Sequence, residues 1–73
     1  MQFQKIKIKE EFIRLDSALK FANFVSTGGH AKIVIQDGEV KVNGEICTQR
    51  GKKLRNGDTV EYGGKGIIVS YED

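Results

Sequence analysis

The chain has 73 residues, of which 38% are hydrophobic and 30% are charged, and its formal net charge is +2. This length suits one small hydrophobic core, so we expect residues 1–73 to form a single domain. The longest apolar runs have three residues, which excludes a membrane-spanning helix. The first residues lack the apolar stretch of a secretory signal, so we expect none. A single cysteine allows no internal disulfide, and we expect a cytoplasmic location.

The charges are unevenly distributed along the sequence. Residues 41–55 contain five basic residues and one acidic residue, whereas residues 56–73 contain four acidic residues and one basic residue. A basic segment within a chain of small net charge indicates a localised anionic partner rather than a generally adhesive surface.

The first expected element is a strand at the N-terminus, within Phe3–Lys9. Ile6 and Ile8 alternate with lysines, a period of two that is typical of a strand with one buried face and one cationic face. Lysines also suit an edge strand, because they hinder pairing with another chain. We expect a monomer, although pairing between chains through this strand is an alternative.

From Leu15 onward the period changes to that of a helix. Apolar residues repeat at the spacing of one helical face at Leu15, Ala18, Leu19 and Ala22. We expect Phe21, Phe24 and Val25 to widen this apolar stripe and therefore to belong to the core. Asp16 or Ser17 is expected near the N-terminus of the helix, where a side-chain oxygen can accept a free backbone N–H.

The next segment is ambiguous. The first helix is expected to stop at Ser26–Gly29, because consecutive glycines are poor helix formers. Over residues 30–38, three β-branched residues at Ile33–Ile35 favour a strand. The spacing of the apolar residues, Thr27 as an N-cap and Gly38 as a C-terminal cap instead favour a short second helix, which is the structure we expect.

After Gly38 the period returns to two, which predicts strands. Val40 and Val42 alternate with Lys41, and Asn43–Gly44 is a strong signal for a hairpin turn. Further strands are expected at Ile46–Thr48, Thr59–Tyr62 and Ile67–Tyr71, with turns at Asn56–Asp58 and Gly63–Gly66. This order predicts a small α+β protein: an N-terminal strand, two helices and a mostly antiparallel sheet.

Four fragments of the sequence together resemble a known family. They are Arg14–Asp16 with Leu19, Thr27–Lys32, Gly38–Gly44 and Gly57–Val60. In this order and spacing they resemble the S4 RNA-binding domain, which is named after ribosomal small-subunit protein four and is also called the alpha-L motif. The resemblance covers about residues 14–61 and is closest to small stand-alone bacterial members with Thr-Gly-Gly before the second helix.

The resemblance implies a helix-turn-helix and a β-hairpin that together bind structured RNA, often ribosomal RNA. It also implies that Ile33–Ile35 is helical. The sequence departs from the family at Gly28, where many members carry a basic residue. Either one phosphate contact is absent for this reason, or His30 and Lys32 supply it.

Thr27–His30 is the first candidate RNA-binding segment. At the start of a helix, free backbone N–H groups and the helix dipole favour an anion such as an RNA phosphate. By spacing alone, Gly28 and Gly29 fit a tight turn somewhat better, and His30 fits an ordinary surface position; the resemblance favours RNA contact. No cysteine or second histidine lies near His30, so we expect neither a metal nor a cofactor.

The second candidate is a cluster of four cations within six residues, at positions 50–55. Such a run is as often a solvated loop as a binding site, but neighbouring cations repel each other and favour a partner that neutralises them. Asn43, by contrast, is well explained by turn formation alone, as in any Asn-Gly pair, and its role in RNA contact rests mostly on the resemblance. The full set of predicted RNA-binding residues is Arg14, Lys20, Thr27, Gly28, Gly29, His30, Lys32, Lys41, Asn43, Arg50, Lys52, Lys53 and Arg55.

The remaining distinctive residues suggest structural roles. Tyr62 and Tyr71 are expected to pack on the sheet, and Cys47 to be a buried, inert thiol in a short strand. The sequence contains no nucleophile with a general base and a general acid at spacings that indicate catalysis. We therefore expect that the protein is not an enzyme. The sequence therefore predicts a cytoplasmic protein that binds structured RNA, ribosomal RNA above all, and associates with ribosomal particles. A protein-interaction module without RNA is the alternative.

Overall fold

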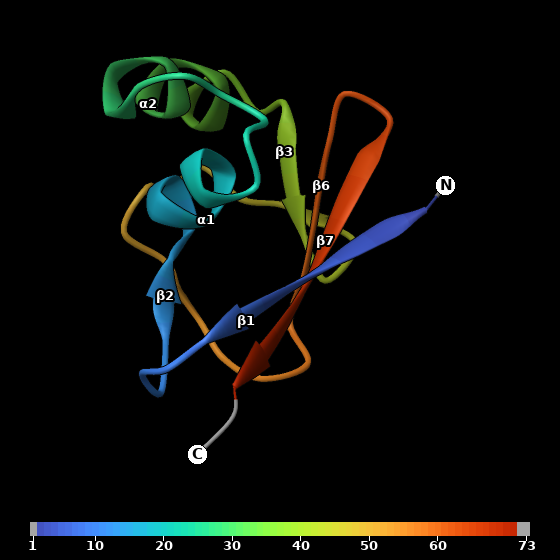
Figure 1. Ribbon diagram of the computed structural model, residues 1–73. Helices are drawn as coiled ribbons and strands as arrows, with labels where there is room; N and C mark the ends of the chain where they lie inside the picture. The colour runs from blue at the N-terminus through green and yellow to red at the C-terminus, as the bar shows by residue number, and fades with distance from the viewer. Residues whose placement is uncertain (1, 72–73) are drawn as a thin grey trace.

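The computed structural model describes residues 2–71, which form two helices and seven strands (Figure 1). Their order along the chain is β1 (Phe3–Ile8), β2 (Ile13–Arg14), α1 (Leu15–Phe21), α2 (Gly28–Gln36), β3 (Val40–Val42), β4 (Glu45–Ile46), β5 (Lys53–Leu54), β6 (Thr59–Tyr62) and β7 (Lys65–Tyr71). This is the α+β architecture that the sequence predicts. Neither helix of the described residues is long and apolar enough to cross a membrane.

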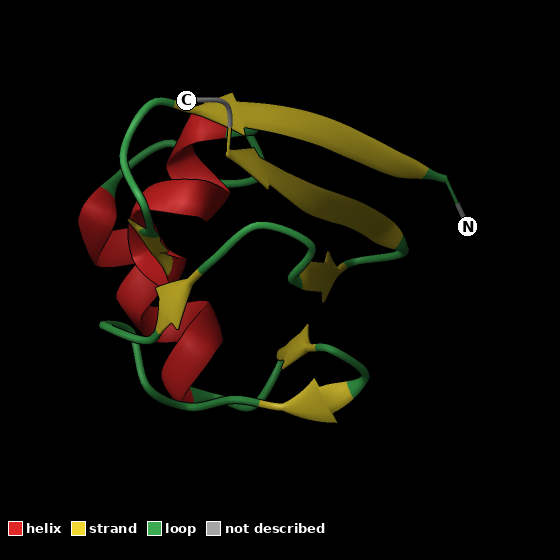
Figure 2. Ribbon diagram, turned by 90° about the horizontal axis from the view of Figure 1, so that it is seen from below, coloured by secondary structure: helices red, strands yellow, loops and turns green. Residues whose placement is uncertain are grey.

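The main sheet has five strands in the order β1-β7-β6-β3-β4. Three of its four neighbouring pairs are antiparallel, and β1 pairs with β7 in parallel, with Ile6 opposite Val69. The expectation of a mostly antiparallel sheet is confirmed. Figure 2 shows both helices on one side of the molecule and the long strands curving along the other.

The N-terminal strand follows its predicted pattern. Ile6 and Ile8 are buried, whereas Lys5 and Lys7, which alternate with them, are exposed. The strand lies at the edge of the sheet, where its lysines were expected.

Helix α1 carries the predicted apolar stripe but ends earlier than expected. Leu15, Ala18 and Leu19 are fully buried, yet the helix stops at Phe21 and not at Ser26–Gly29. The reason is a Schellman-type end: Asn23 adopts a left-handed φ of 62°, and the Phe24 N–H donates to the Leu19 carbonyl at 2.9 Å. Asparagine tolerates this conformation better than most residues.

The early end of α1 also changes the positions of its aromatic residues. Val25 is buried and Phe24 is half-buried against the core, but Phe21 is 58% exposed, so its expected place in the core is wrong. At about 100° per residue, Phe21 lies well outside the stripe centred on Leu15 and Leu19.

The ambiguous segment is a helix. The Oγ1 atom of Thr27 accepts the His30 N–H at 3.0 Å, which is the predicted N-cap contact. At the other end, Gly38 has a φ of 77°, and the Glu39 N–H donates to the Val34 carbonyl. Both glycines of the Thr-Gly-Gly sequence therefore open α2 rather than close α1.

A second, two-stranded sheet was not foreseen. Strand β2 pairs with β5, with Ile13 opposite Leu54 and Arg14 opposite Lys53. Strands of two residues have no alternation that a sequence pattern can reveal. The pair ties the loop of residues 47–52, called the 47–52 loop below, to the start of α1.

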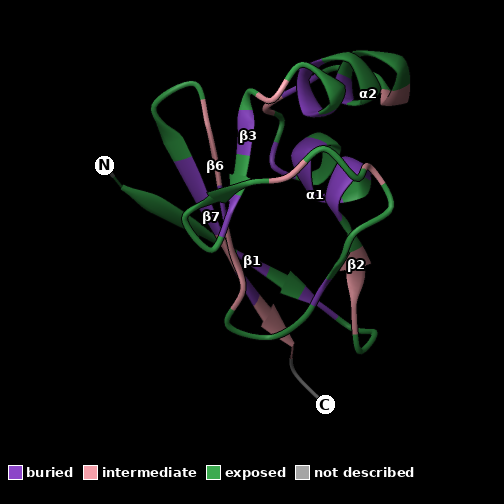
Figure 3. Ribbon diagram, turned by 180° about the vertical axis from the view of Figure 1, so that it is seen from behind, coloured by how far each residue is buried: buried purple, intermediate pink, exposed green. Residues whose placement is uncertain are grey.

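The core lies between the helices and the main sheet and contains the buried apolar residues. They are coloured purple in Figure 3 and occur in both helices and in several strands. Tyr62 and Tyr71 pack against this core, as expected. Cys47 is only half-buried and follows β4 rather than lying within it, so its predicted place in a strand is wrong.

Candidate nucleic-acid interface

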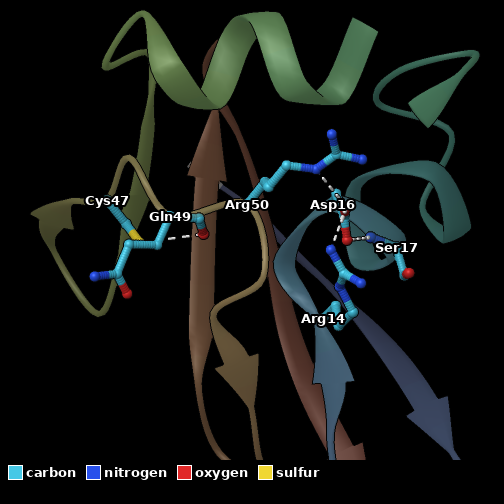
Figure 4. Close-up of polar contacts among 6 residues, drawn as sticks. All are labelled: Arg14, Asp16, Ser17, Cys47, Gln49 and Arg50. Carbon is cyan, nitrogen blue, oxygen red and sulfur yellow. Dashed lines mark hydrogen bonds and ion pairs between the residues drawn. The ribbon is translucent and has the colours of Figure 1, made fainter. Parts of the chain in front are cut away.

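Asp16 organises the most distinctive polar cluster of the protein. One of its carboxylate oxygens, Oδ2, accepts from Arg14 Nη2 at 3.2 Å and from Arg50 Nε at 3.1 Å (Figure 4). The other, Oδ1, accepts the Ser17 N–H at 2.8 Å. As expected, Asp16 lies near the helix N-terminus and accepts a backbone N–H there, although the N-cap residue itself is Arg14, which makes no side-chain capping bond.

The backbone reinforces this contact between α1 and the 47–52 loop. The Leu15 N–H donates to the Lys52 carbonyl at 2.9 Å, and the Asp16 N–H donates to the Arg50 carbonyl at 3.1 Å. These carbonyls satisfy N–H groups that the start of a helix leaves without partners. Arg50 thus binds Asp16 through both its backbone and its side chain, and this double contact fixes the loop.

The two arginines remain largely open to solvent although they are held in place. The side chains of Arg14 and Arg50 are 52% and 41% exposed, whereas that of Asp16 is 9% exposed. Each guanidinium uses one nitrogen on Asp16, and its other N–H donors point elsewhere. We call Arg14 and Arg50 the arginine pair; they carry two positive charges against one buried carboxylate.

Further cations lie next to the arginine pair. Lys53 is the strand partner of Arg14, and its Nζ lies 4.8 Å from the centre of the Phe12 ring. Arg55 also approaches this ring, with its Cζ at 5.8 Å from the centre. Both contacts are cation–π interactions that restrain long side chains. The structure therefore brings together Arg14, Arg50, Lys53 and Arg55, with Lys52 exposed on the adjoining loop.

The start of α2 has the geometry expected of an anion site. Its cap leaves the Gly28 and Gly29 N–H groups without partners inside the helix, and Gly29 and His30 are exposed. Apart from its chain neighbours and the helix's own backbone, no described atom lies within 4 Å of the position that a Gly28 Cβ would occupy, and Gly28 itself is half-buried. Lys32 is exposed one turn further, and Lys20 is exposed in the last turn of α1.

Lys41 and Asn43 have surroundings that differ from those of the basic cluster. Lys41 is exposed on β3 opposite Glu61 and shares a shallow hollow with Glu39 and Glu61. Asn43 donates to Asp58 Oδ1 at 3.1 Å and accepts the Thr59 N–H at 2.9 Å. With a φ of 52° it forms the predicted turn with Gly44, and its polar atoms hold that turn against β6.

Sequence reasoning missed Phe12 and the true role of Asp16. Phe12 stands in no repeating pattern, because it precedes a strand of two residues. The contact between Asp16 and Arg50 joins residues 34 positions apart and leaves no local signal. Among residues 2–71, no group of three His, Cys, Asp or Glu side chains is placed to hold a metal ion.

Comparisons with known proteins agree with this architecture. The chain is 44% identical over 61 residues to a protein of Bacillus subtilis (strain 168) named "Probable ribosome maturation protein RlbA", with 84% of this chain and 86% of that protein covered. It is 34% identical over 61 residues to "Putative RNA-binding protein YbcJ" of Escherichia coli (strain K12), covering 84% and 87%.

The solved structures contain the same fold. The solution structure of YbcJ from Escherichia coli, described as an alpha-L motif involved in RNA binding, superimposes with a TM-score of 0.72 at 30% identity. The match covers 96% of this chain and 90% of that one. Residues 6–70 match the family model of the S4 domain. The resemblance predicted from the four fragments is confirmed, and the chain belongs to the S4 domain family.

Proposed function

We propose that this protein binds structured RNA, and ribosomal RNA in particular, through phosphate and shape contacts, without catalysing a reaction. The observation that carries the proposal is the arginine pair, held on Asp16 beside the cations of the 47–52 loop and β5. The names of the relatives, one in ribosome maturation and the other, YbcJ, in RNA binding, support the same class of partner.

The arginine pair is suited to phosphate because it is both charged and already ordered. A guanidinium presents several N–H donors in one plane and can bind two phosphate oxygens at once. Holding Arg14 and Arg50 on one carboxylate reduces the side-chain entropy that binding would otherwise cost. RNA duplexes expose phosphates and 2′-hydroxyls rather than readable base edges, so such contacts favour shape over sequence.

The other predicted residues extend this surface in the proposal. Gly28 and Gly29 offer backbone N–H groups at the start of α2, and the helix dipole adds to their attraction for phosphate. His30 and Lys32 supply the side chains next to them. Asn43 contributes by holding its turn, and the surrounding positive field comes from Lys20, Lys41, Lys52, Lys53 and Arg55.

The proposal includes a cellular setting. Binding to ribosomal RNA would place the protein on ribosomal particles in the cytoplasm, as a monomer in a single domain. RNA would be its partner, and no metal, cofactor or membrane takes part in this function.

The test reverses charge where folding does not depend on it. Lys52→Glu with Lys53→Glu removes two exposed cations beside the arginine pair, whereas Arg50→Glu would set a second carboxylate against Asp16. We expect the double variant to bind ribosomal RNA more weakly and to lower the slope of log affinity against log salt by about one per lost phosphate contact. Fluorescence anisotropy with labelled ribosomal RNA fragments over a salt series measures both quantities.

Lys5→Glu with Lys65→Glu is the matched control. Lys5 is exposed on β1, and Lys65 lies over the Phe24 ring at 4.9 Å, much as Lys53 lies over Phe12. Both double variants therefore change the net charge by the same amount, and each removes a lysine from the face of one aromatic ring. If both double variants lost the same affinity for RNA, the change in net charge alone would explain the loss, and this result would count against the site.

Sequencing of RNA crosslinked to the protein in cells identifies the target. Enrichment of one structured RNA that disappears in the Lys52→Glu, Lys53→Glu variant is the expected result. No enrichment over that variant, together with binding to a protein partner that depends weakly on salt, would favour the protein-interaction alternative.

A further inference from the structure

A groove next to the arginine pair is not used by the contacts described above. It has a volume of about 540 Å³, within the range of about 300–1,000 Å³ that is typical of ligand sites. It lies between the end of β1, strand β2 and helix α1, and its lining includes Ile8, Phe12, Ile13, Arg14, Ser17 and Phe21. Arg14 belongs to both the groove and the arginine pair, so the two surfaces are continuous.

Phe21 gives this groove an exposed aromatic side. Its ring is 58% exposed although the residue lies in the last turn of a helix whose opposite face is fully buried. A second, smaller hollow is lined by Ser17, Lys20 and Phe21. Phe21 therefore lines two hollows, with Arg14 also lining the first and Lys20 also lining the second.

Phe12 has a different part in the groove. Lys53 and Arg55 already lie over its ring, at 4.8 and 5.8 Å. Phe12 is half-buried and lines the groove, and its ring holds these two cations, which are not themselves among the residues that line it. Phe12 thus supplies positive charge indirectly, whereas Phe21 remains the aromatic surface on which a flat molecule can stack.

We propose that the groove receives an unpaired nucleotide of the bound RNA, with its base stacked on Phe21 and its phosphates beside Arg14 and the cations held by Phe12. The inference rests on the proposed function, because the groove and the phosphate surface share Arg14. The charge argument selects this occupant: the lining has three cations, Lys7, Lys9 and Arg14, against one carboxylate, Glu10. An aromatic wall with this excess of positive charge complements a flat base on an anionic backbone. A bulged or looped nucleotide next to a helix presents both groups together.

Ultraviolet crosslinking to purified bacterial ribosomal RNA tests the inference, and it works whichever segment of that RNA the protein binds. The complex is irradiated, digested with trypsin and nuclease, and analysed for nucleotide adducts by mass spectrometry. Cleavage after Lys20 and Lys32 releases Phe21 in the peptide of residues 21–32, and fragment ions distinguish Phe21 from Phe24. We expect a nucleotide adduct on Phe21.

The outcomes separate this inference from the proposed function. Adducts confined to the 47–52 loop or to α2 would overturn the stacking site and leave RNA binding in place. If no nucleotide adduct that diminishes at high salt formed anywhere on the protein, both the stacking site and the proposed RNA binding would be overturned.

A pair of variants gives a second, quantitative test. Phe21→Leu keeps an apolar side chain but removes the aromatic face, and it should weaken binding to ribosomal RNA about fivefold or more, as expected for loss of one stacked base. Phe3→Leu is the matched control, because Phe3 is 44% exposed at the start of β1, whereas the groove is lined by the end of that strand. Circular dichroism confirms folding of both variants. Equal affinities of Phe21→Leu and Phe3→Leu would overturn the inference.

Discussion

At the scale of single residues, Asp16 is the side chain on which the arrangement of the interface depends. Without its carboxylate, Arg14 and Arg50 would repel each other and the 47–52 loop would lose its side-chain contacts with α1. Asp16 is an acidic residue within a surface proposed to bind an anion, so its contribution cannot be the local field. It contributes by fixing where two cations stand.

The substitution Asp16→Asn separates the effect of holding Arg14 and Arg50 in place from the effect of net charge on RNA binding. The variant loses two charge-assisted bonds, and because the arginines are half-exposed we expect a cost of about 1–2 kcal/mol, or a fall in Tm of about 4–16 °C for a protein of this size. The variant also gains a net positive charge, so a field effect alone would tighten RNA binding. We expect binding to weaken instead, about threefold or more, because preorganisation is lost.

Calorimetry and anisotropy measure the two effects of this substitution. Asp37→Asn at the exposed C-cap of α2 is the control with the same chemical change and should alter stability by less than about 0.5 kcal/mol. If Asp16→Asn tightened RNA binding as the added charge alone predicts, the role assigned to Asp16 would be wrong.

At the scale of elements, both helices are defined by the residues at their ends. Asn23 and Gly38 adopt left-handed conformations just beyond α1 and α2, and Thr27 caps α2 through its hydroxyl. With seven and nine residues, neither helix would be stable alone in water. Their ends and their packing on each other determine where the proposed phosphate-binding N–H groups lie.

Removal of the cap hydroxyl of α2 tests this dependence. Thr27→Ala leaves the His30 N–H without its acceptor and should lower the free energy of unfolding by about 1 kcal/mol, whereas Thr27→Ser keeps the oxygen and should cost only a few tenths. Urea unfolding curves give both values. A loss of equal size in the two variants would mean that the methyl group, not the cap bond, is responsible.

At the scale of the whole molecule, one small core connects both helices and most of the strands to the binding surface. Ile6 from the edge strand is 2% exposed and belongs to the same core as Leu15 of α1 and Leu54 of β5. Proteins of this size have few kcal/mol of net stability, so one cavity can remove most of it.

The same substitution at a buried and at an exposed isoleucine tests how far the stability of the protein depends on this core. Ile6→Ala creates a cavity in the core and should lower the free energy of unfolding by about 2–4 kcal/mol. Ile33→Ala removes the same atoms from a side chain that is 59% exposed and should change it by less than about 0.5 kcal/mol. Thermal unfolding of the two variants side by side shows the difference, and similar midpoints would contradict the core described here.

Structural features that depend on the pattern of neighbouring residues could be predicted from the sequence. Features that depend on contacts between residues far apart in the sequence could not. The alternation around Ile6 and the turn at Asn43 depend on neighbouring residues, and both were predicted correctly. Arg14 and Arg50 are both candidates from the sequence, but their meeting on Asp16 depends on a separation of 34 positions. Phe21 was misassigned because it was counted with the apolar stripe, whereas its angular position on the helix turns it away from Leu15 and Leu19 and leaves it 58% exposed.

The parallel pairing of β1 with β7 has a consequence for synthesis of the chain. The first strand receives its partner only after residue 65 has been added, and at about 5–20 residues per second this delay lasts about 3–11 s after Ile8. Throughout that time β1 is an unpaired strand with one apolar face, the kind of segment that associates with other unfinished chains. The lysines that alternate with its isoleucines protect it during this interval, so they serve the nascent chain as much as the finished protein.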